Sequence, residues 1–113
     1  MLLFKKKFLA AIRDGQKTQT IRLWPFRRMR TGQRSYIPGI GHIRLTAVER
    51  VELADLTDAD AVPDGFATAA ALREEIAQLY PKQLAEGYHA YRIVFMMEPK
   101  PSTAETGPSA ASC

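Results

Sequence analysis

The chain has 113 residues, of which 46% are hydrophobic and 25% are charged, and its formal net charge is +4. This length suits one domain with a real core, and the composition excludes a fibrous or wholly disordered protein. The apolar runs fall far short of the roughly 20 residues of a membrane-spanning helix. The lone cysteine, Cys113, excludes an internal disulfide and a Cys-based zinc site. We therefore expect a soluble, cytoplasmic protein with no membrane partner.

The first element that the sequence predicts is a short helix that ends near Asp14. Phe4, Phe8 and Ile12 recur at helical spacing. Gly15 follows at the position where a left-handed residue commonly stops a helix.

Two strands separated by a charged loop are expected next. Thr18 to Leu23 contains β-branched residues and ends before Pro25, which cannot extend an interior strand. Residues 24–31 show neither helical nor strand periodicity and carry several charges, which is typical of a loop. A second strand is expected over Gln33 to Ile37, because a glycine precedes it and proline and glycine residues follow it.

Residues 42–53 are expected to form one long, half-buried strand. Their apolar side chains share one parity and their polar side chains share the other, as in a strand with one face on the core. The apolar set consists of Ile43, Leu45, Ala47, Val51 and Leu53.

The second half of the chain predicts a helical region and a closing strand. The acidic stretch LTDADAVPDGF, residues 56–66, favours a short helical turn, and Thr68 is placed to cap a longer helix that Pro81 ends. That helix has an apolar stripe formed by Leu72, Ile76, Leu79 and Tyr80. The last strand lies within residues 88–97 and places Tyr91, Ile93, Phe95 and Met97 on one face.

This order of elements predicts an α+β domain over residues 1–98. The strands are not separated by regular crossover helices, so a mostly antiparallel sheet is favoured, either curved or closed into a β-barrel with flanking helices. Residues 99–113 are rich in Pro, Ser, Thr, Ala and Gly, which predicts a disordered tail.

The charge is distributed unevenly between the two halves of the domain. Residues 1–44 contain eleven Lys or Arg and one acidic residue, whereas residues 45–98 contain four Lys or Arg and ten acidic residues. Clustered arginines such as Arg27, Arg28 and Arg30 suit phosphate oxygens. A solvated basic loop that pairs with the acidic half explains the same pattern equally well.

The stretch GQKTQTIR, residues 15–22, gathers the chemistry of a candidate amide-cleaving site. Amide cleavage needs a nucleophile, a base, a proton donor and an oxyanion partner. Thr20 has a hydroxyl, Lys17 is a base if burial lowers its pKa, Asp64 can carry a proton, and Arg22 can hold an oxygen. In a regular strand Lys17 and Thr20 point to opposite faces, so their cooperation requires Lys17 to lie in the turn after Gly15.

Several motifs, in this order, resemble the ASCH domain, a family in the PUA-like group of RNA-associated β-barrels. The matching positions run from Phe8 to Ile12, continue through Gly15, Lys17, Thr20, Arg22, Gly32 and LTDADAVPDGF, and end with Tyr80-Pro81 and Val94-Phe95. The resemblance covers residues 2–97 and implies a PUA-like fold.

The residue at position 20 directs the resemblance to one branch of the family. The broad family motif has glutamate at this position. The threonine found here resembles the branch of bacterial amidohydrolases that remove the acetyl group from N4-acetylcytidine. In that branch the lysine, the threonine and a downstream carboxylate are implicated in catalysis, which by resemblance are Lys17, Thr20 and Asp64. The branch has glutamate at the last position, and aspartate is one methylene shorter.

Other polar and aromatic residues are candidates for ligand binding. Arg22, Arg27, Arg28 and Arg30 can hold an anionic or polar ligand, and Trp24, in its charged loop, is the better candidate for stacking a base. Core packing is favoured for Phe66, and a structural turn explains Asp64 as well as chemistry does. The two histidines, at 42 and 89, have no partners at metal-ligand spacing, so neither a metal nor another cofactor is expected.

Three functions remain as hypotheses. The first is binding of RNA or a modified pyrimidine nucleoside in a basic cleft between residues 15–22 and 56–66, which needs only the cations and a cleft. The second is hydrolysis of an N4-acetylcytidine-type nucleoside in the same cleft. The third is RNA cleavage, in which Lys17 and an acid assist attack by a ribose hydroxyl.

Overall fold

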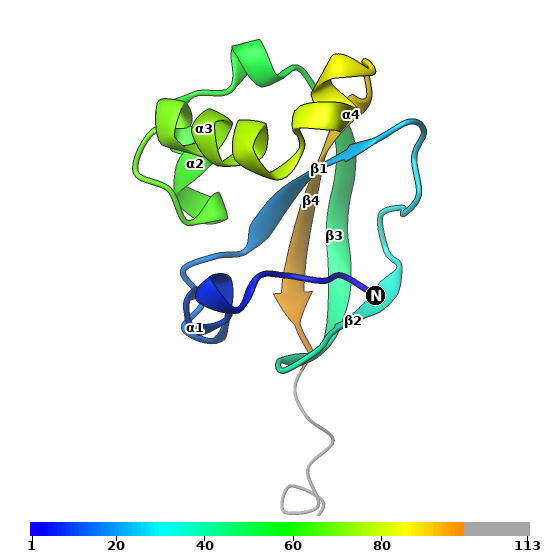
Figure 1. The fold of residues 1–113 in the computed structure, drawn as a ribbon. Coiled ribbons are helices and arrows are strands. Elements are labelled where there is room, and N and C mark those ends of the chain that lie inside the picture. Colours follow the sequence, from blue (N-terminus) through cyan, green and yellow to red (C-terminus); the bar gives the residue numbers. More distant parts are fainter. Residues whose placement is uncertain (99–113) are drawn as a thin grey trace, which may run out of the picture.

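A curled antiparallel sheet forms the centre of the computed structural model, which describes residues 1–98 (Figure 1). Its strands are β1 (Gln19–Trp24), β2 (Arg34–Ile37), β3 (Gly41–Val51) and β4 (His89–Met97). They lie in the order β1-β4-β3-β2, and every neighbouring pair is antiparallel. The expected α+β class with a curved antiparallel sheet is therefore confirmed. The tail expected over 99–113 lies outside the described residues.

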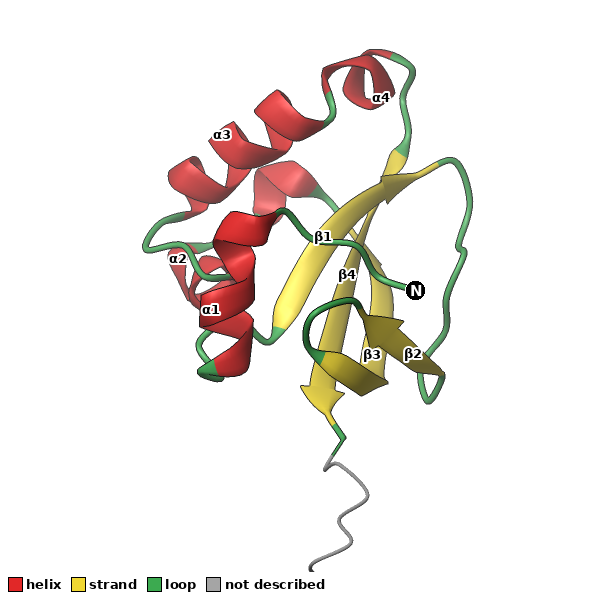
Figure 2. Ribbon diagram, turned by 60° about the horizontal axis from the view of Figure 1, so that its bottom comes forward, coloured by secondary structure: helices red, strands yellow, loops and turns green. Residues whose placement is uncertain are grey.

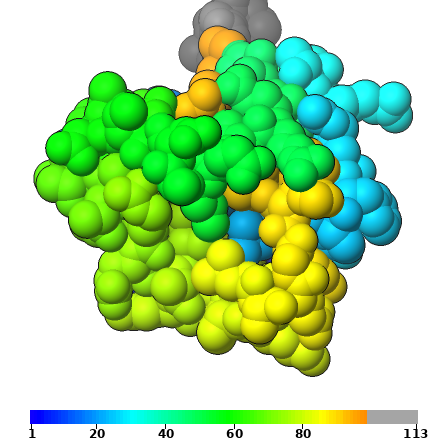
Figure 3. All heavy atoms as spheres, turned by 90° about the horizontal axis from the view of Figure 1, so that it is seen from above, coloured from blue at the N-terminus to red at the C-terminus, as the bar shows by residue number. Residues whose placement is uncertain are grey.

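Short helices flank this sheet (Figure 2). The N-terminal one is α1 (Leu9–Arg13), which follows a 3-10 turn, Lys6–Phe8. The others are α2 (Asp58–Ala61), α3 (Ala69–Leu79) and α4 (Pro81–Ala85), with 3-10 turns at Leu53–Asp55 and Val62–Asp64. In the view from the end where α4 lies, the green and yellow atoms of the helical region surround a hollow (Figure 3). Blue atoms, in the colour of β1, are visible at the bottom of this hollow. Within residues 1–98, none of these helices combines the length and hydropathy that crossing a membrane requires.

The two faces of the sheet bury separate apolar clusters. One face packs strand residues such as Ile37, Ile43 and Ile93 against Leu2 and Ile12. The opposite face packs against α2 and α3, and its members are Ile21, Leu23, Leu56, Ala61, Leu72, Ile76 and Ala90. The predicted apolar stripe of the long helix is thus the surface that holds α3 to β1.

A bulge in β3 changes which residues face the core. Leu45 pairs with Phe95 and Ala47 pairs with Val94, so Thr46 is an extra residue in the ladder. Beyond this point the buried residue is Val48, at 5% exposure, in the cluster that contains Leu45. We expected every second residue from Ile43 onward to face the same core. This expectation was wrong after Leu45, because one extra residue moves the following side chains to the opposite faces of the sheet.

The first residues of the chain cross the gap between the two edge strands of the curled sheet (Figure 1). We call residues 1–5 the N-terminal strap. The backbone N–H of Leu2 donates to the carbonyl of Tyr36 on β2 at 2.9 Å. The guanidinium of Arg22 on β1 donates to the carbonyl of Leu3 at 2.6 Å. The strap therefore links the two edges of a half-barrel that strand pairing leaves open.

Candidate functional site

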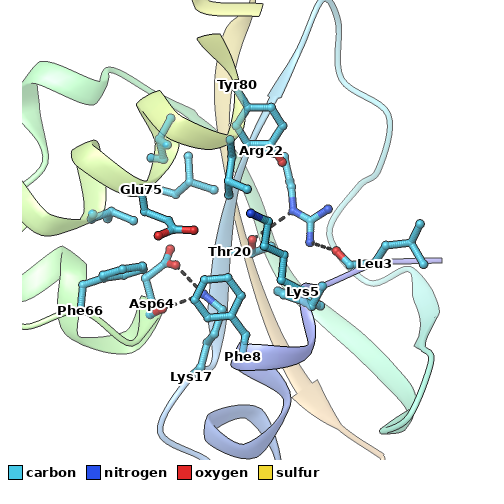
Figure 4. A pocket seen from close by; sticks show the side chains of 15 residues that line it. Leu3, Lys5, Phe8, Lys17, Thr20, Arg22, Asp64, Phe66, Glu75 and Tyr80 are labelled. Atoms are coloured by element: carbon cyan, nitrogen blue, oxygen red, sulfur yellow. Dashed lines mark hydrogen bonds and ion pairs between the residues drawn. The ribbon is translucent and has the colours of Figure 1, made fainter.

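A cavity of about 100 Å³ lies beside β1, between the N-terminal strap and α3 (Figure 4). Three of its lining residues are the sequence-predicted Lys17, Thr20 and Asp64, and Arg22 is a fourth. Residues 15–22 and 56–66 therefore contribute to one site, as the sequence predicts.

A buried ion pair forms one wall of the cavity. Lys17 and Asp64 are 3% and 2% exposed, and the Lys17 ammonium donates to Asp64 Oδ1 and to the Asp64 carbonyl, each at 2.6 Å. Lys17 precedes β1 and lies in the turn after Gly15, where its backbone N–H bonds the Ala11 carbonyl. This placement meets the condition for Lys17 to share a site with Thr20.

Gln19 completes the surroundings of the Asp64 carboxylate. Its side-chain amide donates to Asp64 Oδ2 at 3.3 Å and to the Asp60 carbonyl at 2.9 Å. Both oxygens of Asp64 thus accept a hydrogen bond. The sequence showed Gln19 only as one of several polar residues in GQKTQTIR, since its contact with residues 60 and 64 depends on tertiary structure.

Burial shifts both members of the ion pair toward their neutral forms. Loss of solvent lowers the pKa of the Lys17 amine, although the charge and hydrogen bond of Asp64 oppose this shift. Loss of solvent likewise raises the pKa of the Asp64 carboxyl, against the opposing effects of Lys17, Gln19 and Arg22. The lowered pKa of Lys17 and the raised pKa of Asp64 both favour transfer of a proton from the amine to the carboxylate.

Thr20 and Arg22 lie side by side on one face of β1. The Thr20 side chain is buried, and its Oγ1 accepts a hydrogen bond from Arg22 Nε at 3.1 Å. The Arg22 guanidinium also lies 4.7 Å from the centre of the Phe4 ring, and its burial lowers its pKa. Since the Thr20 oxygen accepts from Arg22, its own proton is available to another base.

Aromatic rings surround the Lys17 ammonium on its remaining sides. The rings of Phe4, Phe8 and Phe66 have their centres 5.7, 5.0 and 5.8 Å from Nζ. Phe66 packs against the apolar cluster beside α2 and α3, as expected, and it also lines the cavity. Apolar side chains make up more than half of the cavity lining, and such surroundings strengthen electrostatic effects.

Three further polar residues, Lys5, Glu75 and Tyr80, line the cavity and were not singled out from the sequence. Glu75 and Tyr80 both extend from the α3 end of the site (Figure 4). One feature of the sequence indicates that Glu75 could belong to a site. It lies three residues after Leu72, which places a carboxylate within the apolar stripe of α3. Tyr80 was assigned to that stripe as an apolar residue.

The structure does not bring the other predicted ligand-binding residues to the cavity. Trp24 is 9% exposed and packs on Tyr91 at a ring separation of 5.3 Å, so its assignment to base stacking is corrected to a core role. Arg27 donates to the Val48 carbonyl at 2.6 Å, and Arg28 lies over the ring of Phe26. Arg27, Arg28 and Arg30 line a separate open hollow in the β1–β2 loop. The predicted basic residues therefore lie in two separate places. Lys17 and Arg22 line the cavity, and the three arginines line the loop hollow.

Among residues 1–98, no three His, Cys, Asp or Glu side chains are grouped as a metal site would require. Lys17 and Arg22, the cations beside Thr20 and Asp64, suit an oxygen-rich organic ligand better than a metal ion.

Comparison with known proteins shows the fold. Protein EF3133 from Enterococcus faecalis V583, described with the DUF984 family model, superposes with a TM-score of 0.61 over 79% of this chain and 68% of its own, at 18% identity. The hypothetical protein PH0355 superposes with a TM-score of 0.68 over 82% of this chain and 93% of its own, at 14% identity. No family model and no curated protein matches the chain. The chain thus has the α+β fold of these two proteins, with a curled antiparallel sheet and flanking helices.

Proposed function

We propose that this protein is an amidohydrolase that removes a small acyl group from an N-acylated pyrimidine nucleoside of the N4-acetylcytidine type. The observation that carries the proposal is the buried Lys17–Asp64 pair, which opens together with Thr20 into one apolar cavity. A buried ion pair is weak evidence for stability, and strongly perturbed titratable groups in a cavity are candidates for catalysis. The resemblance to the ASCH amidohydrolase branch supports the substrate class.

In the proposed first half-reaction, Thr20 attacks the amide carbonyl. Transfer of a proton from Lys17 to Asp64 leaves a neutral amine, which takes the Thr20 hydroxyl proton as the C–O bond forms. Lys17 then donates that proton to the leaving nitrogen as the C–N bond breaks. The products are an acyl-threonine ester and the free amino group of the base.

Arg22 is the candidate for stabilising the oxyanion in this step. Its Nε and Nη2 atoms donate to Thr20 and Leu3, and a hydrogen bond with Tyr80 opposes the lowering of the Arg22 pKa by burial. A guanidinium donor next to the nucleophile suits the negative charge that develops on the carbonyl oxygen.

The size of the cavity favours a small substrate over a polynucleotide. Its volume of about 100 Å³ suits an acyl group and the edge of one ring, since a single water occupies about 30 Å³ in the liquid. Phe66 and Phe8, already in edge contact at 6.2 Å, offer apolar surface to such a ring.

Mass-spectrometric turnover of N4-acetylcytidine by the purified protein tests the proposal. We expect turnover by the wild type, and a loss of about 10²-fold or more in Lys17→Met and in Thr20→Val, which keep the side-chain size. Arg30→Ala, outside the cavity, is the matched control and should keep wild-type activity. A wild type without turnover, or a Thr20→Val variant of full activity, contradicts the proposal.

A second candidate function, RNA binding, is supported by the separate hollow in the β1–β2 loop. Arg28 and Arg30 are exposed in its lining, and Phe26 is 65% exposed in the same loop. Cations beside an exposed aromatic ring suit single-stranded nucleic acid. We expect salt-sensitive binding of a labelled RNA oligonucleotide that weakens when Arg28 and Arg30 are changed to Gln. Binding that survives these changes would exclude the loop as an RNA site.

A further inference from the structure

Glu75 is a carboxylate of the cavity to which the first half-reaction assigns no role. It extends from α3, its side chain is 13% exposed, and Figure 4 shows its carboxylate pointing into the cavity on the side of Asp64. The negative charge of Glu75 is among the effects that raise the pKa of Lys17, after the larger effects of Asp64. The carboxylate therefore faces the same space as the reacting groups.

The two carboxylates of the cavity differ in how fully they are engaged. Asp64 accepts from Lys17 on one oxygen and from Gln19 on the other, so both of its oxygens are already bonded to protein donors. Glu75 Oε1 accepts from Lys7 Nζ at 3.1 Å, and Lys7 is 56% exposed. Glu75 Oε2 has no hydrogen-bond partner in the part of the chain that the structure describes.

We propose that Glu75 is the general base of the second half-reaction, in which water hydrolyses the acyl ester on Thr20. This inference rests on the proposed amidohydrolase function and divides its chemistry between the two carboxylates. Asp64 exchanges a proton with Lys17 for ester formation, and Glu75 activates water for ester cleavage.

The proposed step is balanced within the site. Glu75 Oε2 takes one proton from water as the water oxygen bonds to the acyl carbon. The bond between that carbon and Thr20 Oγ1 then breaks, and Thr20 recovers a proton from Glu75. The products are the free acid and the original hydroxyl. Return of the proton from Asp64 to Lys17 restores the ion pair, and Glu75 is again ionised.

Intact-protein mass spectrometry with rapid quenching tests this role. With N4-acetylcytidine, Glu75→Gln should release about one equivalent of cytidine per protein in a burst, and then turn over about 10²- to 10⁴-fold more slowly than the wild type. The variant should accumulate the added mass of one acetyl group, located on Thr20 by peptide mapping. Glu74→Gln is the matched control, because Glu74 is the exposed neighbour on α3 that bonds Gln78, and it should show neither effect.

Other outcomes of this experiment overturn the inference. Steady turnover of Glu75→Gln at the wild-type rate shows that Glu75 is not the base. Loss of the burst together with turnover, in a variant whose far-UV circular dichroism and melting temperature match the wild type, places Glu75 in the first half-reaction instead.

A second substrate separates this inference from the proposed function. If the wild type does not turn over N4-acetylcytidine, the proposed substrate class fails, and the activated ester p-nitrophenyl acetate then serves to acylate Thr20 directly. Loss of the acetyl group from Thr20 should be about 10²-fold slower in Glu75→Gln than in the wild type. Equal rates overturn the role of Glu75, and absence of any acetylation of Thr20 overturns both proposals.

Discussion

Lys17 and Asp64 hold opposite charges 2.6 Å apart and almost without solvent. Removing two charges from water costs several kcal/mol for each ion, and the attraction within the pair offsets this cost only in part. Structural stability alone therefore gives little reason to keep such a pair between three phenylalanine rings. The pair is better explained by chemistry in the adjoining cavity.

Replacement of the pair by apolar residues tests this explanation. Asp64→Leu alone leaves Lys17 buried without its partner and should lower the free energy of unfolding by about 3–5 kcal/mol. The double variant Lys17→Met/Asp64→Leu should recover most of that loss. Urea unfolding of the wild type, both single variants and the double variant measures this, and a double variant as unstable as Asp64→Leu would contradict the explanation.

The same variants give a pH dependence whose sign follows from the two pKa shifts. Burial raises the pKa of Asp64 above its ordinary value of 3.8, so this carboxyl lowers the stability of the wild type as the pH rises from 3.8 through the raised pKa. Burial lowers the pKa of Lys17 below its ordinary value of 10.5, so this amine increases stability as the pH rises from the lowered pKa toward 10.5.

We therefore expect the free energy of unfolding of the wild type, minus that of Lys17→Met/Asp64→Leu, to be lowest between these two pH ranges. Urea unfolding at a series of pH values measures the difference, and subtraction of the double variant removes the contribution of other titrating groups. A difference that is highest at intermediate pH would show that pairing outweighs burial.

The sequence identified four side chains of the cavity better than their hydrogen-bond partners. Lys17, Thr20, Arg22 and Asp64 were found because residue types and a short spacing carry that information. Trp24 was misassigned because its neighbours in the sequence are charged, whereas its neighbours in space are core residues such as Tyr91. Contacts between distant segments decide such cases, and one sequence does not contain them directly.

At the scale of elements, the turn that ends the Val62–Asp64 segment sets the position of the Asp64 carboxylate. Gly65 follows it with φ of 93°, in the left-handed region that most side chains disfavour. The position of a Cβ at Gly65 would lie 3.8 Å from the Lys17 side chain, an ordinary contact distance. Backbone strain, rather than crowding, therefore explains why glycine suits this position.

Substitutions at Gly65 test this argument. Gly65→Ala should lower the free energy of unfolding by about 1–2 kcal/mol through the left-handed conformation. Gly65→Asn should lower it less, because asparagine tolerates this conformation. Thermal and urea unfolding compare the two, and an asparagine variant that is less stable than the alanine variant would point to crowding instead.

Secondary structure was predictable wherever periodicity was unbroken. The end of α1 before Gly15 and the apolar stripe of α3 follow directly from residue spacing. The bulge at Thr46 was not predictable, since no glycine or proline marks it and the alternation of the strand continues through it. Its cause lies in the pairing of Leu45 and Ala47 with successive residues of β4.

At the scale of the whole molecule, the N-terminal strap holds the edge strands of the half-barrel together. Leu2 is 2% exposed and belongs to the larger apolar cluster, whereas its neighbour Leu3 is 63% exposed. The strap also forms one side of the cavity through Phe4 and the Leu3 carbonyl. Closure of the barrel and formation of the site therefore depend on the same five residues.

Two neighbouring leucines provide a matched test of the strap. Leu2→Ala should lower the free energy of unfolding by about 2–5 kcal/mol, as expected for a buried leucine. Leu3→Ala should change it by about 0.5 kcal/mol or less, because Leu3 contributes its carbonyl rather than its side chain. Equal effects of the two substitutions in urea unfolding would show that the strap does not pack as described.

The order of the strands has a consequence for synthesis on the ribosome. β4 lies between β1 and β3 in the sheet, yet it follows both of them in the chain. Until residues 89–97 leave the exit tunnel, β1 has no strand to pair with, and the nascent chain must keep the apolar faces of β1 and β3 from aggregating. Pauses in translation before codon 89 should therefore extend the period in which the growing polypeptide depends on chaperones.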